Sequence, residues 1–209
     1  MTDSVTKPFE TAAQQRHAAA FGIWLFLATE VLFFGVLLTV YAVARCLHPD
    51  DFLAAARHSR LAIGTLNSVL LLTSSLMVSL AVKSEQLGQR RSVAPLLIVA
   101  IGLGLAFGAA KGVEYYLDVE DGYWPGSGSA IATPAGQLYW SLYWLMTGVH
   151  AMHLAVGIAI LTAVVVLLTR EGNETRRINR LRVSALYWHL VDIVWIVLYP
   201  LLYLAGRAA

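Results

Sequence analysis

Five long apolar segments restrict what this chain can fold into more than any other feature. They cover residues 19–44, 61–82, 93–117, 137–169 and 183–204. A bilayer core is about 30 Å thick and an α-helix rises about 1.5 Å per residue, so about 20 apolar residues span it. The segments are continuously apolar rather than alternating, which argues against a β-barrel. The sequence therefore predicts an all-α, polytopic membrane bundle of five transmembrane helices, as one domain over residues 1–209.

The polar remainder of the chain excludes several classes of function. Only 13% of the residues are charged, and no polar stretch is long enough to form a soluble catalytic domain. The basic connection 170–182 fits a topology anchor beside anionic headgroups better than a nucleic-acid site. Cys46 is the single cysteine, which excludes an internal disulfide or a thiolate metal cluster. Function is therefore expected within the bundle or in its contacts with partner chains and lipids.

The distribution of basic residues predicts the orientation. Lys7, Lys83, Arg90, Arg91 and five arginines of 170–182 fall on one side of the predicted membrane. The opposite side carries the acidic start of the long connection 118–136. By the positive-inside rule, the N-terminus is expected in the cytoplasm and the C-terminus on the outer side.

Ionisable side chains inside the apolar segments are the candidate proton-handling or buried polar residues. Each costs roughly 2.5–3.5 kcal/mol at the membrane centre, so a functional role is the first hypothesis for each. Counting about 1.5 Å per residue from the cytoplasmic edge predicts two layers. The inner layer holds Glu30, His189 and Asp192. The outer layer holds Lys111, Glu114, His150 and His153.

Three pairs of these residues are spaced three apart, which places both members of each pair on one helix face. They are Lys111 with Glu114, His150 with His153, and His189 with Asp192. A histidine that donates to a carboxylate one turn away, or on another helix at equal depth, offsets part of the cost of burying either group. The polar faces are therefore expected to look toward protein. For the lysine pair, snorkelling to the interface remains an alternative.

Glu30 is an isolated carboxyl among Trp, Leu, Phe and Val, and it is expected to be partly protonated unless a cation or donor lies close. Two roles stay open: a proton-handling group, or a neutral hydrogen-bonding group that fixes helix packing. No metal site is expected, because haem-ligating histidines come from facing helices at matched depth and no Glu-x-x-His pair suggests a di-iron centre.

Four stretches, in this order, resemble the cytochrome c oxidase subunit III family of haem-copper terminal oxidases. They are WLFLATEVLFFGVLLTVYA, KGVEYY, YWLMTGVHAMHLAVG and LYWHLVDIVWIVLYP. The resemblance covers most of the chain from Trp24 to Tyr203. Because seven-helix members have two further N-terminal helices, the match is to the five-helix bacterial form.

The resemblance implies an accessory, non-catalytic subunit of a proton-pumping oxygen reductase that serves aerobic electron transport in the bacterial inner membrane. The chain would hold no haem or copper, which belong to partner subunits, and would bind subunits I and II, with subunit IV as a further candidate. It would stabilise subunit I, bind phospholipid in a cleft and support proton uptake. Glu30 matches the family's buried, carbodiimide-reactive carboxyl, and the candidate lipid contacts are Glu30, His153 and Arg182.

The electron donor is the finer question within this resemblance. The quinol-oxidase class has Asp where this chain has Glu30 and Phe where it has Tyr187, so these two residues favour cytochrome c. A quinol oxidase subunit III and a nitric oxide reductase-associated homologue remain alternatives. From a different class, a haem-binding membrane anchor also remains. A transporter is disfavoured, because Pro95 and Pro200 lie near helix ends and leave no broken helix.

Overall fold

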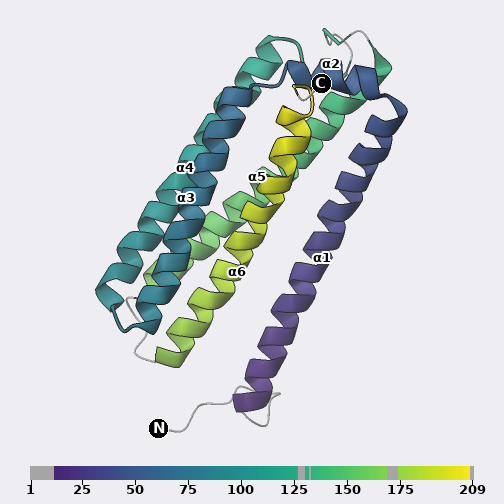
Figure 1. Ribbon diagram of the computed structural model, residues 1–209. Helices are drawn as coiled ribbons and strands as arrows, with labels where there is room; N and C mark the ends of the chain where they lie inside the picture. Colours follow the sequence, from purple (N-terminus) through teal and green to yellow (C-terminus); the bar gives the residue numbers. More distant parts are fainter. Residues whose placement is uncertain (1–11, 127–129, 132, 169–173, 208–209) are drawn as a thin grey trace.

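The computed structural model describes residues 12–126, 130–131, 133–168 and 174–207 as helices and their connections, with no strand in these ranges. Five of the helices are long and apolar enough to cross a membrane, which confirms the all-α prediction (Figure 1). Lys7 and Arg170 lie outside the described residues. The helices are α1 (Ala12–Leu47), α2 (Pro49–Arg57), α3 (Leu61–Gln86), α4 (Arg90–Glu120), α5 (Pro134–Leu168) and α6 (Glu174–Tyr199), followed by the π-helical turn η1 (Pro200–Leu204).

The short helix α2 lies between the first two spans, and the apolar segments did not predict it. Pro49 begins this helix, and Asp50 and Asp51 in its first turn face the positive end of the helix dipole. Phe52 and Ala56 are buried. A helix of nine residues is too short to form an apolar segment of membrane length. Its first-turn residues Pro49, Asp50 and Asp51 and its apolar face are nevertheless visible in the sequence.

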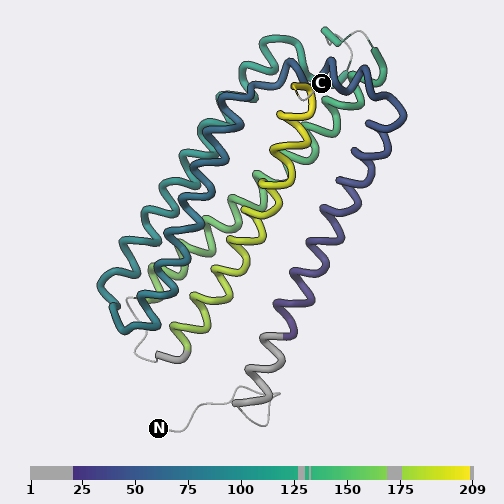
Figure 2. Tube along the Cα trace, in the orientation of Figure 1, coloured from purple at the N-terminus to yellow at the C-terminus, as the bar shows by residue number. Residues whose placement is uncertain are grey.

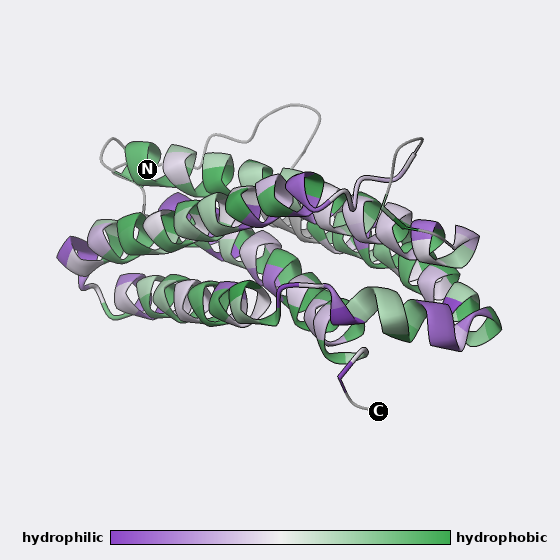
Figure 3. Ribbon diagram, turned by 90° about the horizontal axis from the view of Figure 1, so that it is seen from above, coloured by the Kyte–Doolittle hydropathy of each residue, from purple (hydrophilic) through white to green (hydrophobic). Residues whose placement is uncertain are grey.

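Four of the spanning helices form a closed ring, in which α3 packs on α4, α4 on α5, α5 on α6 and α6 on α3. Helix α1 stands outside this ring and contacts α5 and α6, as the tube in Figure 2 shows. Hydrophobic residues extend along the whole length of the long helices (Figure 3). We call the end with the α3–α4 turn (residues 87–89) the basic end, and the end with α2 and η1 the C-terminal end.

The centre of the ring is filled by Trp188 of α6, which two glycines accommodate. A Cβ atom added to Gly104 of α4 would lie 2.9 Å from the Trp188 ring, and one added to Gly157 of α5 would lie 3.1 Å from it. Small residues allow helices to approach closely in membranes, and these two glycines have that role here. Gly102 and Gly148 have nothing within 4 Å of such an atom.

Aromatic residues close the bundle at the C-terminal end. Aromatic residues at the end of a spanning helix often form a belt at the membrane surface, but Tyr139 and Trp140 are 0% and 1% exposed and face the protein core. Tyr139 and Tyr41 donate hydrogen bonds of 2.7 Å to the carbonyl oxygens of Leu202 and Leu201. These carbonyls lie in η1, where the missing N–H of Pro200 disturbs the α-helical pattern.

We expect Gly104→Ala to destabilise the protein, because the added methyl group must displace the Trp188 ring. Overpacking of this kind costs about 1–3 kcal/mol. The matched control is Gly102→Ala in the same helix, which meets nothing and gains helix propensity of up to about 1 kcal/mol. Thermal unfolding of the full chain in detergent compares the two variants, and equal midpoints would contradict the packing role of Gly104.

Candidate functional site

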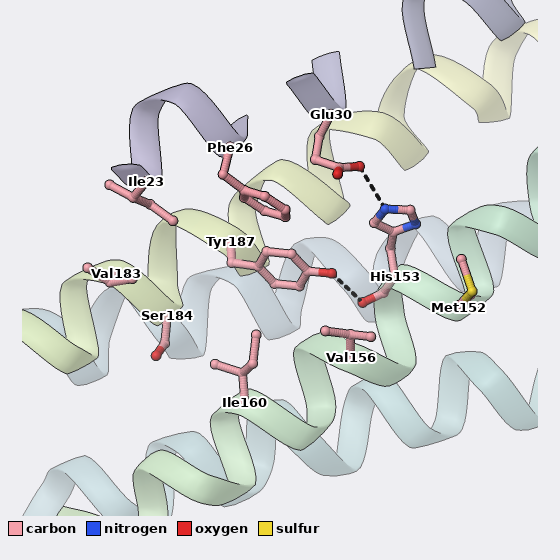
Figure 4. A pocket seen from close by; sticks show the side chains of 10 residues that line it. All are labelled: Ile23, Phe26, Glu30, Met152, His153, Val156, Ile160, Val183, Ser184 and Tyr187. Carbon is pink, nitrogen blue, oxygen red and sulfur yellow. Dashed lines mark hydrogen bonds and ion pairs between the residues drawn. The ribbon is translucent and has the colours of Figure 1, made fainter. Parts of the chain in front are cut away.

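The candidate site is a cleft of about 370 Å³ between α1, α5 and α6. Its wall is almost wholly apolar, with one polar pair, as Figure 4 shows. Ile23, Phe26 and Glu30 come from α1, and their spacing of three and four residues places them on one side of this helix. The remaining lining residues come from α5 and α6: Met152, His153, Val156, Ile160, Val183, Ser184 and Tyr187.

The polar pair joins α1 to α5. His153 Nε2 lies 2.8 Å from Glu30 Oε2, and the two side chains are 13% and 18% exposed (Figure 4). His153 Nδ1 lies 2.8 Å from the carbonyl oxygen of Val149, so this nitrogen carries a proton and donates it. The contact with Glu30 then requires one further proton, held either on Nε2 or on the carboxyl group. The pair therefore shares a single exchangeable proton beside the cleft.

Tyr187 forms the wall of the cleft opposite Glu30. Its hydroxyl donates to the carbonyl oxygen of His153 at 3.2 Å, which ties α6 to α5 (Figure 4). Its ring stacks on Phe26 of α1 with centroids 6.0 Å apart. Tyr187 therefore positions the backbone of His153 and also closes the space between α1 and α6.

The contact between Glu30 and His153 shows that the predicted layers were wrong for His153. Helix α5 has 35 residues and is longer than the bilayer core. The depth of His153 counted from the basic end of this helix is therefore too large. Counted from the C-terminal end, Glu30 and His153 lie at about 26 and about 28 Å, which is nearly level. The prediction that a histidine pairs with a carboxylate at equal depth on another helix is confirmed for His153. The predicted layers, however, placed Glu30 and His153 at different depths.

Lys111 and Glu114 form a different, fully enclosed site near the C-terminal end. Their side chains are 3% and 0% exposed, so the snorkelling alternative is wrong. Lys111 Nζ lies 2.9 Å from Glu114 Oε2, 2.6 Å from the Tyr143 hydroxyl and 2.7 Å from the Tyr203 hydroxyl. These three contacts match the three N–H donors of a charged ammonium group.

The two tyrosines pass the hydrogen bonds on to carboxylates. The Tyr203 hydroxyl donates to Glu114 Oε2 at 3.0 Å, and the Tyr143 hydroxyl donates to Asp118 Oδ2 at 3.1 Å. Asp118 Oδ1 lies 3.7 Å from Arg60 Nε at the start of α3. We call Lys111, Glu114, Asp118, Tyr143 and Tyr203 the lysine cluster; it joins α4, α5 and η1.

His150 does not pair with His153, contrary to the expectation of a shared polar face. Its ring lies 5.7 Å from the Phe107 ring and 5.2 Å from the Trp195 ring, inside the four-helix ring. Its two ring nitrogens have no hydrogen-bond partner among the described residues. Residues three apart on a helix differ in direction by about 300°. The side chains of His150 and His153 can therefore point into different interfaces, because each side of α5 has its own neighbouring helix.

His189 faces α3, with its ring nitrogens near Ser75 and Ser79, and neither His189 nor Asp192 lines the Glu30 cleft. Ser75 Oγ of α3 lies 2.6 Å from His189 Nδ1. The hydrogen-bond partner of His189 therefore comes from another helix, whereas Asp192 was expected to pair with it. Such a serine within an apolar helix gives little signal in the sequence.

Two other contacts were not predicted from the sequence. The hydroxyl groups of Tyr143 and Tyr203 accept hydrogen bonds from Lys111. At the basic end, Glu85 and Arg177 form a buried, two-pronged ion pair. Arg182, a candidate lipid contact, is exposed and precedes Val183 and Ser184, which line the cleft.

Comparisons with known proteins show the family of this chain. The family model for cytochrome c oxidase subunit III matches residues 10–207. The chain is 26% identical over 204 residues to "Quinol oxidase subunit 3" of Bacillus subtilis (strain 168), covering 95% of this chain and 93% of the relative. It is 25% identical over 190 residues to "Cytochrome c oxidase subunit 3" of Thermostichus vulcanus, covering 89% and 87%. With nearly its whole length matched, this chain belongs to the cytochrome c oxidase subunit III family of the haem-copper oxidases.

Proposed function

We propose that this chain is the accessory, cofactor-free subunit III of a proton-pumping oxygen reductase in the bacterial inner membrane. It docks on subunits I and II, which hold the haem and copper, and stabilises subunit I. Its N-terminus lies in the cytoplasm, because Lys83, Arg90, Arg91 and the arginines of α6 gather at the basic end. Chemistry on oxygen then belongs to the partner subunits.

The observation that carries this proposal is the 2.8 Å contact between Glu30 and His153 beside an apolar cleft. The cleft binds the acyl chain of a phospholipid along Phe26, Val156 and Ile160. At about 26 Å from the C-terminal end, Glu30 lies too deep for a headgroup. The headgroup instead lies toward Arg182, and the pair acts on protons rather than on the lipid phosphate.

The donor of electrons to the complex is proposed to be cytochrome c. Glu30 and Tyr187 favour this donor, and both line the cleft. The names of the relatives leave quinol as the alternative, since the Bacillus subtilis protein is named for a quinol oxidase and the Thermostichus vulcanus protein for a cytochrome c oxidase.

The lysine cluster has a structural role in this proposal. Every donor of Lys111 is engaged, and Tyr143 and Tyr203 are buried, so no group of the cluster faces the cleft. The charges hold α4, α5 and η1 in register at the C-terminal end, where the chain leaves the bundle.

Isolation of the native complex tests the proposed function. We expect the chain to purify with subunits that carry haem and copper, and we expect the complex to oxidise reduced cytochrome c faster than a quinol. A faster reaction with quinol would support the alternative donor. A stoichiometric haem absorption band from this chain purified alone would contradict the assignment and favour a haem-binding anchor.

Substitution of Glu30 tests the shared proton. Glu30→Gln keeps an oxygen near His153 but cannot take up a proton, so we expect normal assembly with slower proton uptake during turnover. Glu30→Ala leaves a partly buried His153 nitrogen without its partner, which lowers the stability by about 1–3 kcal/mol. Proton uptake of the intact complex and its thermal midpoint separate the two effects; unchanged values in both variants would remove Glu30 from the mechanism.

Removal of one member of the lysine cluster is expected to be worse than removal of both. Lys111→Met leaves Glu114 as an uncompensated buried charge and lowers stability by about 3–5 kcal/mol. Adding Glu114→Gln to this variant restores part of the loss, since the second charge is gone. Thermal unfolding of the full chain measures both, with exposed Lys83→Met as the control. Additive losses from the two substitutions would show that the pair is not coupled.

A further inference from the structure

Two buried tyrosines of the lysine cluster each have a proton acceptor within hydrogen-bond distance. Tyr143 and Tyr203 are both 0% exposed, and their ring centroids lie 6.2 Å apart. The Tyr143 hydroxyl donates to Asp118 at 3.1 Å, and the Tyr203 hydroxyl donates to Glu114 at 3.0 Å. A phenol that loses an electron becomes strongly acidic, so a carboxylate at this distance takes up its proton and makes the oxidation easier. Both tyrosines therefore meet the first condition for a redox-active side chain.

Lys111 determines which form of an oxidised tyrosine is stable at this place. Its ammonium group lies 4.4 Å from the ring centroid of Tyr143 and 5.4 Å from that of Tyr203. A positive charge so close to the ring disfavours a ring cation, because the two charges repel strongly where little water screens them. The same ammonium group donates hydrogen bonds of 2.6 and 2.7 Å to the two phenol oxygens, which remain acceptors after the phenol proton has left. A neutral tyrosyl radical is thus favoured over a cation radical.

A first row of aromatic rings leads from Tyr143 to the surface of the C-terminal end. The centroid of the Tyr143 ring lies 6.5 Å from that of Tyr115, which in turn lies 4.2 Å from the Trp144 ring. The Trp144 ring lies 4.8 Å from the ring of Trp124, and Trp124 is 55% exposed. Rings in van der Waals contact exchange electrons by tunnelling. An oxidant outside the protein can therefore reach Tyr143 through this row without entering the bundle.

A second row runs beside the first one. The Trp140 ring lies 5.0 Å from the Tyr143 ring and 4.7 Å from the Tyr123 ring, which is half-buried. Every ring in the two rows belongs to a tyrosine or a tryptophan, the side chains that give up an electron to one-electron oxidants. Phenylalanine packs as well as tyrosine in apolar surroundings but is not oxidised in this way. Packing by itself therefore does not explain the composition of the rows.

We propose that Tyr143 and Tyr203 form a redox-active tyrosine pair that takes up oxidising equivalents from the C-terminal end through the two rows. The oxidant belongs to the class of one-electron oxidants, such as a peroxyl radical formed when lipids are oxidised. This role adds to the structural role of the lysine cluster. It is separate from the Glu30 cleft and does not require the chain to serve an oxidase.

The reaction moves one electron and one proton. The peroxyl radical takes an electron from Trp124 and, with a proton from water, becomes a hydroperoxide. Tyr143 then passes an electron through Tyr115 and Trp144 to the oxidised Trp124, which is restored. The phenol proton of Tyr143 moves to the Asp118 carboxylate. The products are a hydroperoxide, a neutral tyrosyl radical and a protonated Asp118.

The test oxidises the full chain in nanodiscs with a photochemically generated ruthenium tris-bipyridine oxidant, which is charged and stays in the water. Electron paramagnetic resonance of samples frozen after the flash detects the radical, and ring-deuterated tyrosine separates its signal from that of tryptophan. We expect most of the tyrosyl signal to be lost in the double variant Tyr143→Phe, Tyr203→Phe. We expect the double variant Tyr115→Phe, Trp140→Phe, which interrupts both rows, to form the radical more slowly.

The matched control is Tyr116→Phe. Tyr116 lies next to Tyr115 in α4, is 69% exposed and belongs to neither row. We expect this variant to give the tyrosyl signal of the unmodified chain. Thermal unfolding of each variant shows whether it is folded before its signal is compared.

A measurement on the unmodified chain does not depend on the folding of any variant. The chain is made with lysine that carries the heavy nitrogen isotope, and electron-nuclear double resonance measures the coupling of this nitrogen to the radical. We expect such a coupling, because Lys111 Nζ lies 2.6 and 2.7 Å from the two phenol oxygens. The absence of this coupling would overturn the proposal. So would a tyrosyl signal that is unchanged in Tyr143→Phe, Tyr203→Phe, or one that falls equally in Tyr116→Phe, which would indicate general oxidation of tyrosines.

Discussion

The need to satisfy ionisable side chains within the protein is the constraint on which this structure depends. Inside a bilayer no water is available to a charged group, so each one must find its partners on other helices. Lys111 shows the complete form of this solution, with three donors and three acceptors drawn from α4, α5 and η1. The helices that supply these partners are thereby fixed relative to one another, and the apolar packing fills the space that remains.

Glu30 and His153 show an incomplete form of the same solution, and the difference is what suggests function. Their contact joins two helices, as the lysine cluster does, but both side chains are partly exposed to a cleft. Since Val149 already accepts the Nδ1 proton, the contact with Glu30 requires one further proton, either on Nε2 or on the carboxyl group. A fully enclosed network fixes structure, whereas a half-enclosed pair with one movable proton can exchange it.

The charges of the chain are also separated along the bundle. The lysine cluster and Asp121 lie toward the C-terminal end, and Arg60 links the two through Asp118 and Asp121. At the other end, Glu85 holds Arg177 in place while Arg90 and Arg91 stay at the surface. The basic end is therefore suited to an anionic membrane surface.

The sequence by itself determined the five spans, the all-α architecture and the family, because apolar length and ordered polar motifs are local properties of the chain. It also picked out Glu30, Lys111 and Glu114 as residues that need partners. Only the tertiary structure decided which side chains meet. His153 lies with Glu30 and not with His150, and Ser75 of α3 contacts His189. The tertiary structure also placed α2 across the C-terminal end. The physical reason is that helix length, start and rotation set which side chains meet, and a difference of a few residues at an end moves a side chain by a whole turn.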